Sequence, residues 1–208
     1  MVAFGALFLL FWDSVWLWPL KILVVLFHEL GHAMAAWLTG GVVYEIGLSP
    51  YQGGHTLSGG GIRLITLNAG YFGSLMAGVA LLWASAKPKT AVRATRALTV
   101  LVLLIAVFYV RPLLQFAQLF TVVVGLALGL LSRYGSADVT ATVLRFLGVF
   151  SVMYALWDIR DDVFLGSPNS ISDAAMLAQH TGIPAPIWGS LWVAAGLTVL
   201  WLTRRWIV

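Results

Sequence analysis

Two histidines and a glutamate lie close together in the segment His28-Glu29-Leu30-Gly31-His32. On a helix, residues four positions apart share one face, so His28 and His32 could offer two imidazole nitrogens to one metal ion. This is the H-E-x-x-H pattern, in which the histidines bind zinc and the glutamate takes a proton from the water that the zinc acidifies. The pattern predicts Zn2+ as the cofactor and Glu29 as the catalytic base.

The surroundings of this segment are those of a membrane protein. It lies inside an apolar run from Leu20 to Leu38, and the whole chain of 208 residues is 61% hydrophobic and only 10% charged. Soluble domains carry about 25% charged residues, so we expect a multi-pass integral membrane protein. In a soluble protein, two such histidines are more often surface or core residues. At membrane depth ionisable groups are costly, which favours a functional site.

A zinc site needs a third protein ligand besides the two histidines. The chain has no cysteine, which leaves histidine and carboxylate. Asp158, Asp161 and Asp162 are spaced to face one side of a helix at the end of an apolar span. We expect Asp158, the deepest, to be the ligand, with Asp162 and Asp161 as alternates. The other interpretation is a solvated cap that pairs with Arg160. Zinc retained in an Asp158→Ala variant would move the ligand to Asp161, Asp162 or Asp173.

The hydrophobic pattern predicts one polytopic domain over residues 1–208, an all-α bundle of about six transmembrane helices. A glycine-rich loop or small β-hairpin at 39–61 follows the first confident span. An extended substrate could pair with this hairpin, and we take Gly53 and Gly54, with Asn68 on the next span, as substrate-binding candidates. Met1 to Trp12 shows no basic leader or cleavage pattern, so we expect no removable signal peptide. The expected spans are about 19–38 (the zinc helix), 62–86, 97–110, 113–131, 142–158 and 187–203.

Several motifs together resemble a known family. His-Glu-Leu-Gly-His-Ala at 28–33 resembles the active-site helix of the M50 membrane metallopeptidases, the site-2-protease group, and most closely its M50B-like branch. The Leu-Asp-Gly element that carries the third ligand in better-studied site-2 proteases is not in this sequence. The other motifs of the branch follow in order as Gly60-Gly61-Ile62-Arg63, Ala69-Gly70-Tyr71-Phe72-Gly73-Ser74, Asp158 to Asp162, and Ser172-Asp173-Ala174.

The resemblance implies a zinc-dependent protease whose catalytic helix and aspartate ligand meet within the membrane. His28 and His32 would be ligands, Glu29 the general base and acid, and Asp158 the third ligand. We expect hydrolysis of a peptide bond in membrane-protein substrates at or within the bilayer, in a bacterial inner or plasma membrane. Alternatives are a non-proteolytic protein that keeps the metal site and an ion transporter, which the lack of an inverted repeat disfavours.

The basic residues give information on orientation rather than on nucleic acid, which we do not expect as a partner. They cluster between spans, in the segment from Lys87 to Arg96, at Arg133 and at Arg204-Arg205. Counted by the positive-inside rule, these loops are cytoplasmic, and the glycine-rich loop and the acidic cluster lie outside. The family resemblance instead implies a cytoplasmic loop after the zinc helix. Reporter fusions after Gly54 and after Lys89 would distinguish these two orientations. The sequence does not predict the oligomeric state.

Overall fold

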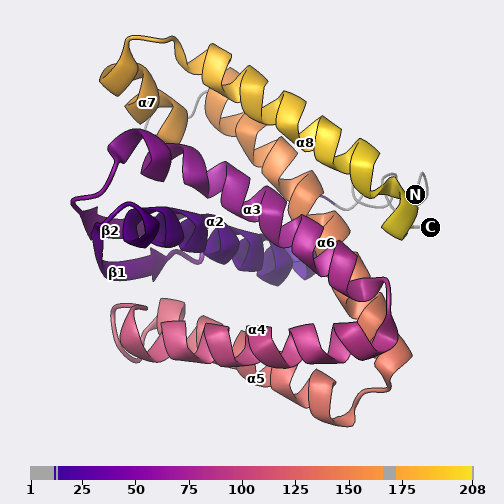
Figure 1. The fold of residues 1–208 in the computed structure, drawn as a ribbon. Coiled ribbons are helices and arrows are strands. Elements are labelled where there is room, and N and C mark those ends of the chain that lie inside the picture. The colour runs from indigo at the N-terminus through magenta and orange to yellow at the C-terminus, as the bar shows by residue number, and fades with distance from the viewer. Residues whose placement is uncertain (1–11, 13, 166–171, 208) are drawn as a thin grey trace.

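A computed structural model describes residues 12, 14–165 and 172–207, with side chains as far as 203 (Figure 1). The expectation for the segment before Trp12 lies outside the described residues. The elements, in chain order, are a 3-10 turn η1 (Val15–Leu17), α2 (Trp18–Leu38), β1 (Val42–Leu48), β2 (Gly54–Gly59), α3 (Arg63–Ser85), α4 (Pro88–Phe108), α5 (Phe116–Tyr134), α6 (Ala137–Ile159), a π-helical turn η2 (Arg160–Leu165), α7 (Asp173–Thr181) and α8 (Ala185–Ile207).

Six helices in the described part of the chain are long and apolar enough to cross a membrane. This confirms the expected all-α membrane bundle with a small hairpin. The third span begins earlier than expected, because Pro88 occupies the first turn of α4 and the helix carries Arg93 and Arg96. Proline suits that position, where its missing N–H has no partner in any case. Long basic side chains near a helix end can reach the membrane surface, so they need not lie in a loop.

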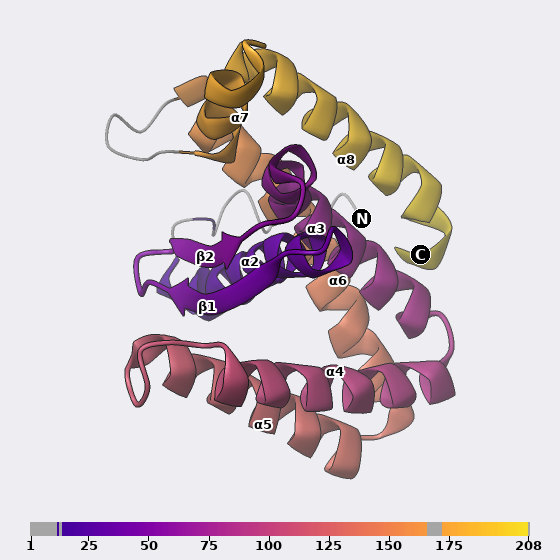
Figure 2. The ribbon, with the colours of Figure 1, turned by 60° about the vertical axis from the view of Figure 1, so that its left-hand side comes forward.

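Helix α2 is the interior helix of the bundle. In its most apolar window 78% of the residues are buried, against 17% for α8 and 28% for α4 and α5. In both ribbon views it lies between the α4–α5 pair and the group formed by α3, α6 and α8 (Figures 1 and 2). A helix that is apolar on all sides is expected at such a position. The H-E-x-x-H segment is therefore held on several sides by other helices.

Small residues allow α2 to pack closely on α3. A Cβ atom built on Gly31 would come within 3.0 Å of the Cα atom of Gly73. The hydroxyl of Ser74 donates a hydrogen bond to the carbonyl of Val24 at 3.4 Å, and the hydroxyl of Ser151 in α6 donates one to the carbonyl of Ser74 at 2.8 Å. Close approach of backbones is the usual means of helix association in lipid. These contacts fix the face of α2 that carries the histidines against α3.

The hairpin packs along α2 and one of its edges is covered. β1 and β2 pair antiparallel from Val42 opposite Gly59 to Leu48 opposite Gly54. On the outer side of β1, the N–H of Ile46 donates to the carbonyl of Tyr109 at 2.9 Å, and the N–H of Arg111 donates to the carbonyl of Ile46 at 3.0 Å. Among the described residues, no other element makes a backbone hydrogen bond to the outer edge of β2. The open edge of the hairpin is therefore that of β2.

The basic connections lie at the other end of the bundle from the hairpin. The links between α3 and α4 and between α5 and α6, beside Lys87 and Arg133, are far from the hairpin and α7 in Figure 1. The glycine-rich loop and the acidic cluster, the two parts expected to form the site, thus lie at the same end of the bundle, as the sequence indicates. Which side is cytoplasmic stays a prediction.

The close contact between α2 and α3 can be tested with a bulky side chain. We expect Gly73→Val to lower the free energy of unfolding by about 1–3 kcal/mol, because overpacking forces neighbouring backbone to shift. A Cβ atom at this position would already meet the carbonyl of Phe27 at 3.1 Å. Met76→Val, at a position 60% exposed on the same helix, is the control. Thermal unfolding in detergent should separate the two, and equal stability would contradict the packing described.

Candidate metal centre

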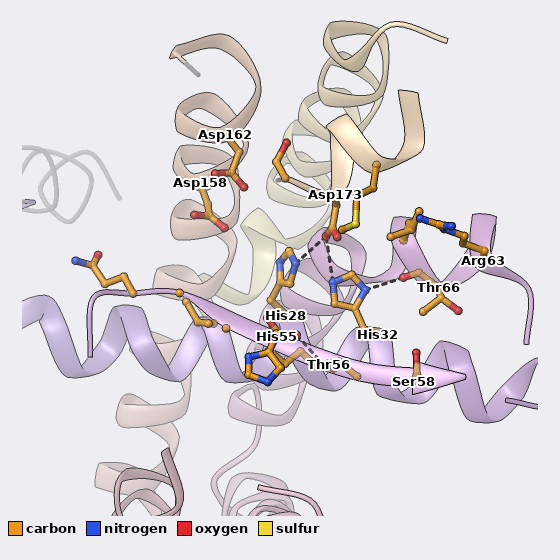
Figure 3. Close-up of a pocket in the computed structure, with 18 of the residues that line it drawn as sticks. His28, His32, His55, Thr56, Ser58, Arg63, Thr66, Asp158, Asp162 and Asp173 are labelled. Atoms are coloured by element: carbon orange, nitrogen blue, oxygen red, sulfur yellow. Dashed lines mark hydrogen bonds and ion pairs between the residues drawn. The ribbon is translucent and has the colours of Figure 1, made fainter. Parts of the chain in front are cut away.

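Two imidazoles and one carboxylate meet inside the bundle (Figure 3). His28 and His32 project from α2, and Asp173 is the first residue of α7. The Nε2 atom of His28 lies 2.9 Å from Oδ2 of Asp173, and the Nε2 atom of His32 lies 3.1 Å from the same oxygen. One ligand atom from each of the three residues lies within 4.8 Å of the other two. Side chains 145 positions apart thus converge on one point.

The backbone of α3 orients the ring of His32. Its Nδ1 atom lies 2.7 Å from the carbonyl oxygen of Thr66. A carbonyl only accepts, so Nδ1 carries the proton and donates it to this bond, which leaves Nε2 as the ligand atom. Metal-binding histidines commonly make such a bond with the second ring nitrogen, because it fixes both the tautomer and the ring plane.

Tyr71 of α3 supports the ring of His28. The two rings meet edge to face, with centroids 4.8 Å apart. The tyrosine hydroxyl donates a hydrogen bond to Oδ2 of Asp162, and the side chain is only 1% exposed. Asp162 therefore acts on the site indirectly, by holding the tyrosine that packs on His28.

The start of α7 presents Asp173 to the histidines. Ser172 caps the helix, its hydroxyl accepting a hydrogen bond from the N–H of Ala175 at 3.3 Å. A carboxylate in the first turn is stabilised by the helix dipole. Burial alone would raise the pKa of Asp173, but the charges of His32 and His28 and their hydrogen bonds hold that pKa well below its usual range. A metal that replaced the Nε2 protons of the two histidines would meet the same carboxylate, which must be ionised to act as a metal ligand.

This donor set fits zinc. Two histidines and one carboxylate are a known catalytic zinc set. Ligand atoms roughly 2.0–2.1 Å from a tetrahedral zinc lie about 3.3 Å from one another, and the observed separations of 2.9 and 3.1 Å are close to that value. Gly70 leaves room for the two imidazoles, since a Cβ atom there would overlap the His28 ring and lie 2.6 Å from Nε2 of His32. In the sequence, Gly70 is interpreted only as a helix-packing residue.

The structure places the expected third ligand beside the group rather than in it. Asp173, and not Asp158, is within hydrogen-bonding distance of the histidines. Asp158 and Asp162 line the adjoining cavity, whereas Asp161 is half exposed and pairs with Arg160 at 3.4 Å. Asp158 and Asp162 thus still face one side, and Asp161 leaves it, because the chain changes from α-helix to π-helix at Arg160 and the angular spacing of the side chains changes.

A cavity of about 800 Å³ adjoins the three residues and also contains Glu29 in its wall. Gly53 and Gly54, two of the expected substrate-binding residues, line it. Asn68 is not among the residues that line it. Its amide donates to the carbonyl of Leu64 and accepts a hydrogen bond from Trp192 Nε1 at 3.1 Å, so it joins α3 to α8. The sequence did not indicate Thr56, Thr66, Gly70 or Tyr71 as residues of the site, and it offered Asp173 only as one of several alternative ligands.

The chain matches the model of a known protein family. A family model described as Peptidase M50B-like matches residues 1–203. No curated protein matches the chain, and no solved structure matches it. The matched range includes the hairpin, all six candidate spans and the three residues of the metal group.

The space at Gly70 can be tested by filling it. We expect Gly70→Ala to reduce bound zinc from about one per chain to near zero, because the added methyl group would occupy the place of the imidazoles. Gly129→Ala in α5, where a Cβ atom would meet only Thr99 at 3.2 Å, should retain the metal. The measurement is elemental analysis of detergent-purified protein. Full zinc in both variants would mean that the imidazoles do not bind metal at this position.

Proposed function

The chain belongs to the Peptidase M50B-like family of membrane metallopeptidases, and from this premise we propose that it is an intramembrane zinc metalloprotease. It would hydrolyse a peptide bond of membrane-protein substrates at or within the bilayer. The observation that carries the proposal is the meeting of His28, His32 and Asp173 inside a bundle of six candidate spans, with Glu29 in the wall of the same cavity. We therefore propose Asp173, in place of the expected Asp158, as the third ligand.

In this proposal the three residues would hold zinc. Bound zinc supplies a Lewis acid for the scissile carbonyl and lowers the pKa of a water toward ~7. Three protein ligands are the number that catalytic zinc sites use. The bond from His32 Nδ1 to Thr66 and the contact of Tyr71 with His28 would keep both rings in place during the reaction.

Glu29 would move the proton. It is 4% exposed, is adjacent in sequence to His28, and lines the cavity. As general base it would take a proton from the attacking water, whose oxygen forms a bond to the carbonyl carbon. As general acid it would return that proton to the nitrogen when the C–N bond breaks. One water is consumed for each peptide bond, and Glu29 ends as it began.

The hairpin offers a place for the substrate. A transmembrane helix must unwind before cleavage, because its carbonyls are hydrogen-bonded within the helix. The unwound segment then needs new backbone partners, and adding it as a strand to an open sheet edge provides them. Since Tyr109 and Arg111 cover the edge of β1, we place the substrate along β2, with Gly53 and Gly54 near its path.

The protein is a multi-pass integral membrane protein, and a membrane protease acts on substrates that share its bilayer. We propose the bacterial inner or plasma membrane as its location. The ligand group includes Asp173, the first residue of α7, and borders the cavity that the hairpin also lines, so it lies toward the end of the bundle that carries both elements. A substrate would therefore be cut nearer that end than the end with the basic connections.

Zinc content will identify the ligands. We expect about one zinc per chain in detergent-purified wild-type protein, and loss of the metal in His28→Ala, His32→Ala and Asp173→Ala. Asp158→Ala should retain it, because Asp158 lies in the cavity wall outside the ligand group. The opposite pattern, with zinc kept in Asp173→Ala and lost in Asp158→Ala, would restore Asp158 as the ligand.

Replacing the base will separate catalysis from metal binding. We expect Glu29→Gln to keep its zinc and to lose cleavage by about 100-fold or more, the usual contribution of a general base. The assay uses a panel of fluorophore-labelled single-span transmembrane peptides in micelles. Undiminished cleavage by Glu29→Gln would exclude this mechanism. Zinc-loaded wild-type protein that cuts no member of the panel would favour the non-proteolytic alternative.

A further inference from the structure

The carboxylate of Glu29 is held by the hairpin rather than by its own helix. The hydroxyl oxygen of Thr56, on β2, lies 2.8 Å from Oε2 of Glu29 and 2.9 Å from its backbone carbonyl oxygen. Both are acceptors, so the single hydroxyl proton is shared between them. Among the described residues, Thr56 is the one hydrogen-bond donor that the structure gives this carboxylate. Figure 3 shows Thr56 on the strand that runs beside α2.

A second residue of the same strand makes room for the carboxylate. Gly54 precedes Thr56 by two positions, so both face the same side of β2. A Cβ atom at Gly54 would lie 2.8 Å from Cγ of Glu29 and would also meet its Oε1 and a methyl group of Val25. The glutamate side chain is therefore enclosed by β2, with Oε1 against a bare backbone and Oε2 in a hydrogen bond.

The position of Thr56 is in turn fixed by the sheet. Its partner across the hairpin is Ile46, which is fully buried. Ile46 is the residue whose N–H and C=O are bonded on the outer side to Tyr109 and Arg111. The α4–α5 connection is thus hydrogen-bonded to β1, β1 is paired with β2, and Thr56 of β2 donates to Oε2 of Glu29.

From these contacts we propose that Thr56 is a positioning residue for Glu29: the strand that would pair with the substrate also sets the orientation of the base. If Thr56 served only the backbone carbonyl of Glu29, it would bond to the backbone of α2 alone. It bonds to Oε2 of the Glu29 side chain as well. The bond to Oε2 restricts rotation of the carboxylate and keeps it toward the cavity. This inference rests on the proposed function, because it assigns Thr56 a role through Glu29.

A hydroxamate probe tests the proposal without a known substrate. On binding zinc, a peptidyl hydroxamate gives up its hydroxyl proton, which an adjacent carboxylate can accept. We expect Thr56→Val to retain about one zinc per chain and to bind the probe about tenfold more weakly, the usual effect of losing one hydrogen bond to a charged group. Thr56→Ser, which keeps the hydroxyl, should restore wild-type affinity. Thr99→Val, which removes a hydroxyl bonded to a helix carbonyl in α4, is the matched control.

A double-mutant cycle shows whether Thr56 acts through Glu29. In the Glu29→Gln background we expect Thr56→Val to cause no further loss of affinity, since the effects of substitutions at two interacting residues do not add. On any transmembrane peptide that the enzyme cuts, Thr56→Val should lower kcat and leave KM within about twofold. The same tenfold loss in both backgrounds, or wild-type affinity in Thr56→Val, would overturn this inference but not the proposed function. Wild-type protein that binds neither zinc nor hydroxamate would overturn the proposed function and this inference together.

Discussion

The structure depends on the need to satisfy ionisable side chains inside an apolar bundle. An unpaired charge at membrane depth is costly, so such groups must pair with one another or with a metal. His28, His32 and Asp173 do this by converging on one point, and Thr66 accepts the remaining N–H of His32. This convergence requires that α2 and α3 approach closely, which the glycines at their contact allow. The helix packing and the polar group thus depend on each other.

The third member of the group comes from outside the spans. Asp173 opens a short helix of nine residues between α6 and α8, capped by Ser172. Because α7 is not a membrane span, its carboxylate need not cross the membrane as part of a spanning helix. The dipole of α7 also favours a negative charge in the first turn. Asp158 and Asp162 lie on or beyond the end of α6, line the cavity and leave the histidines to Asp173. Four carboxylates, including Glu29, therefore border one cavity in different environments.

The sequence predicts what depends on local pattern. The helix that carries the histidines, the hairpin and six spans follow from hydrophobic length, glycine clusters and the four-residue spacing of His28 and His32. The third ligand does not, because the approach of α7 to α2 depends on how the bundle packs. Ser172 followed by Asp173 is a helix-start signal, but it says nothing of what the helix faces. The start of α4 at Pro88 was missed for a different reason, since basic residues at a helix end resemble those of a loop.

The hairpin lines the cavity and leaves one edge at which another strand could be added. Its β1 edge is bonded to the α4–α5 connection, and its strand β2 encloses Glu29 with the backbone of Gly54 and the side chain of Thr56, so the outer edge of β2 is the one left open. A strand that pairs with the open edge would extend a sheet whose outer strand, β2, already contacts Glu29, the base in our proposal. Peptide position and base orientation would then be set by one rigid element, which is how small displacements are avoided in a site that depends on geometry. The hairpin is for this reason better understood as part of the candidate site than as a loop between two spans.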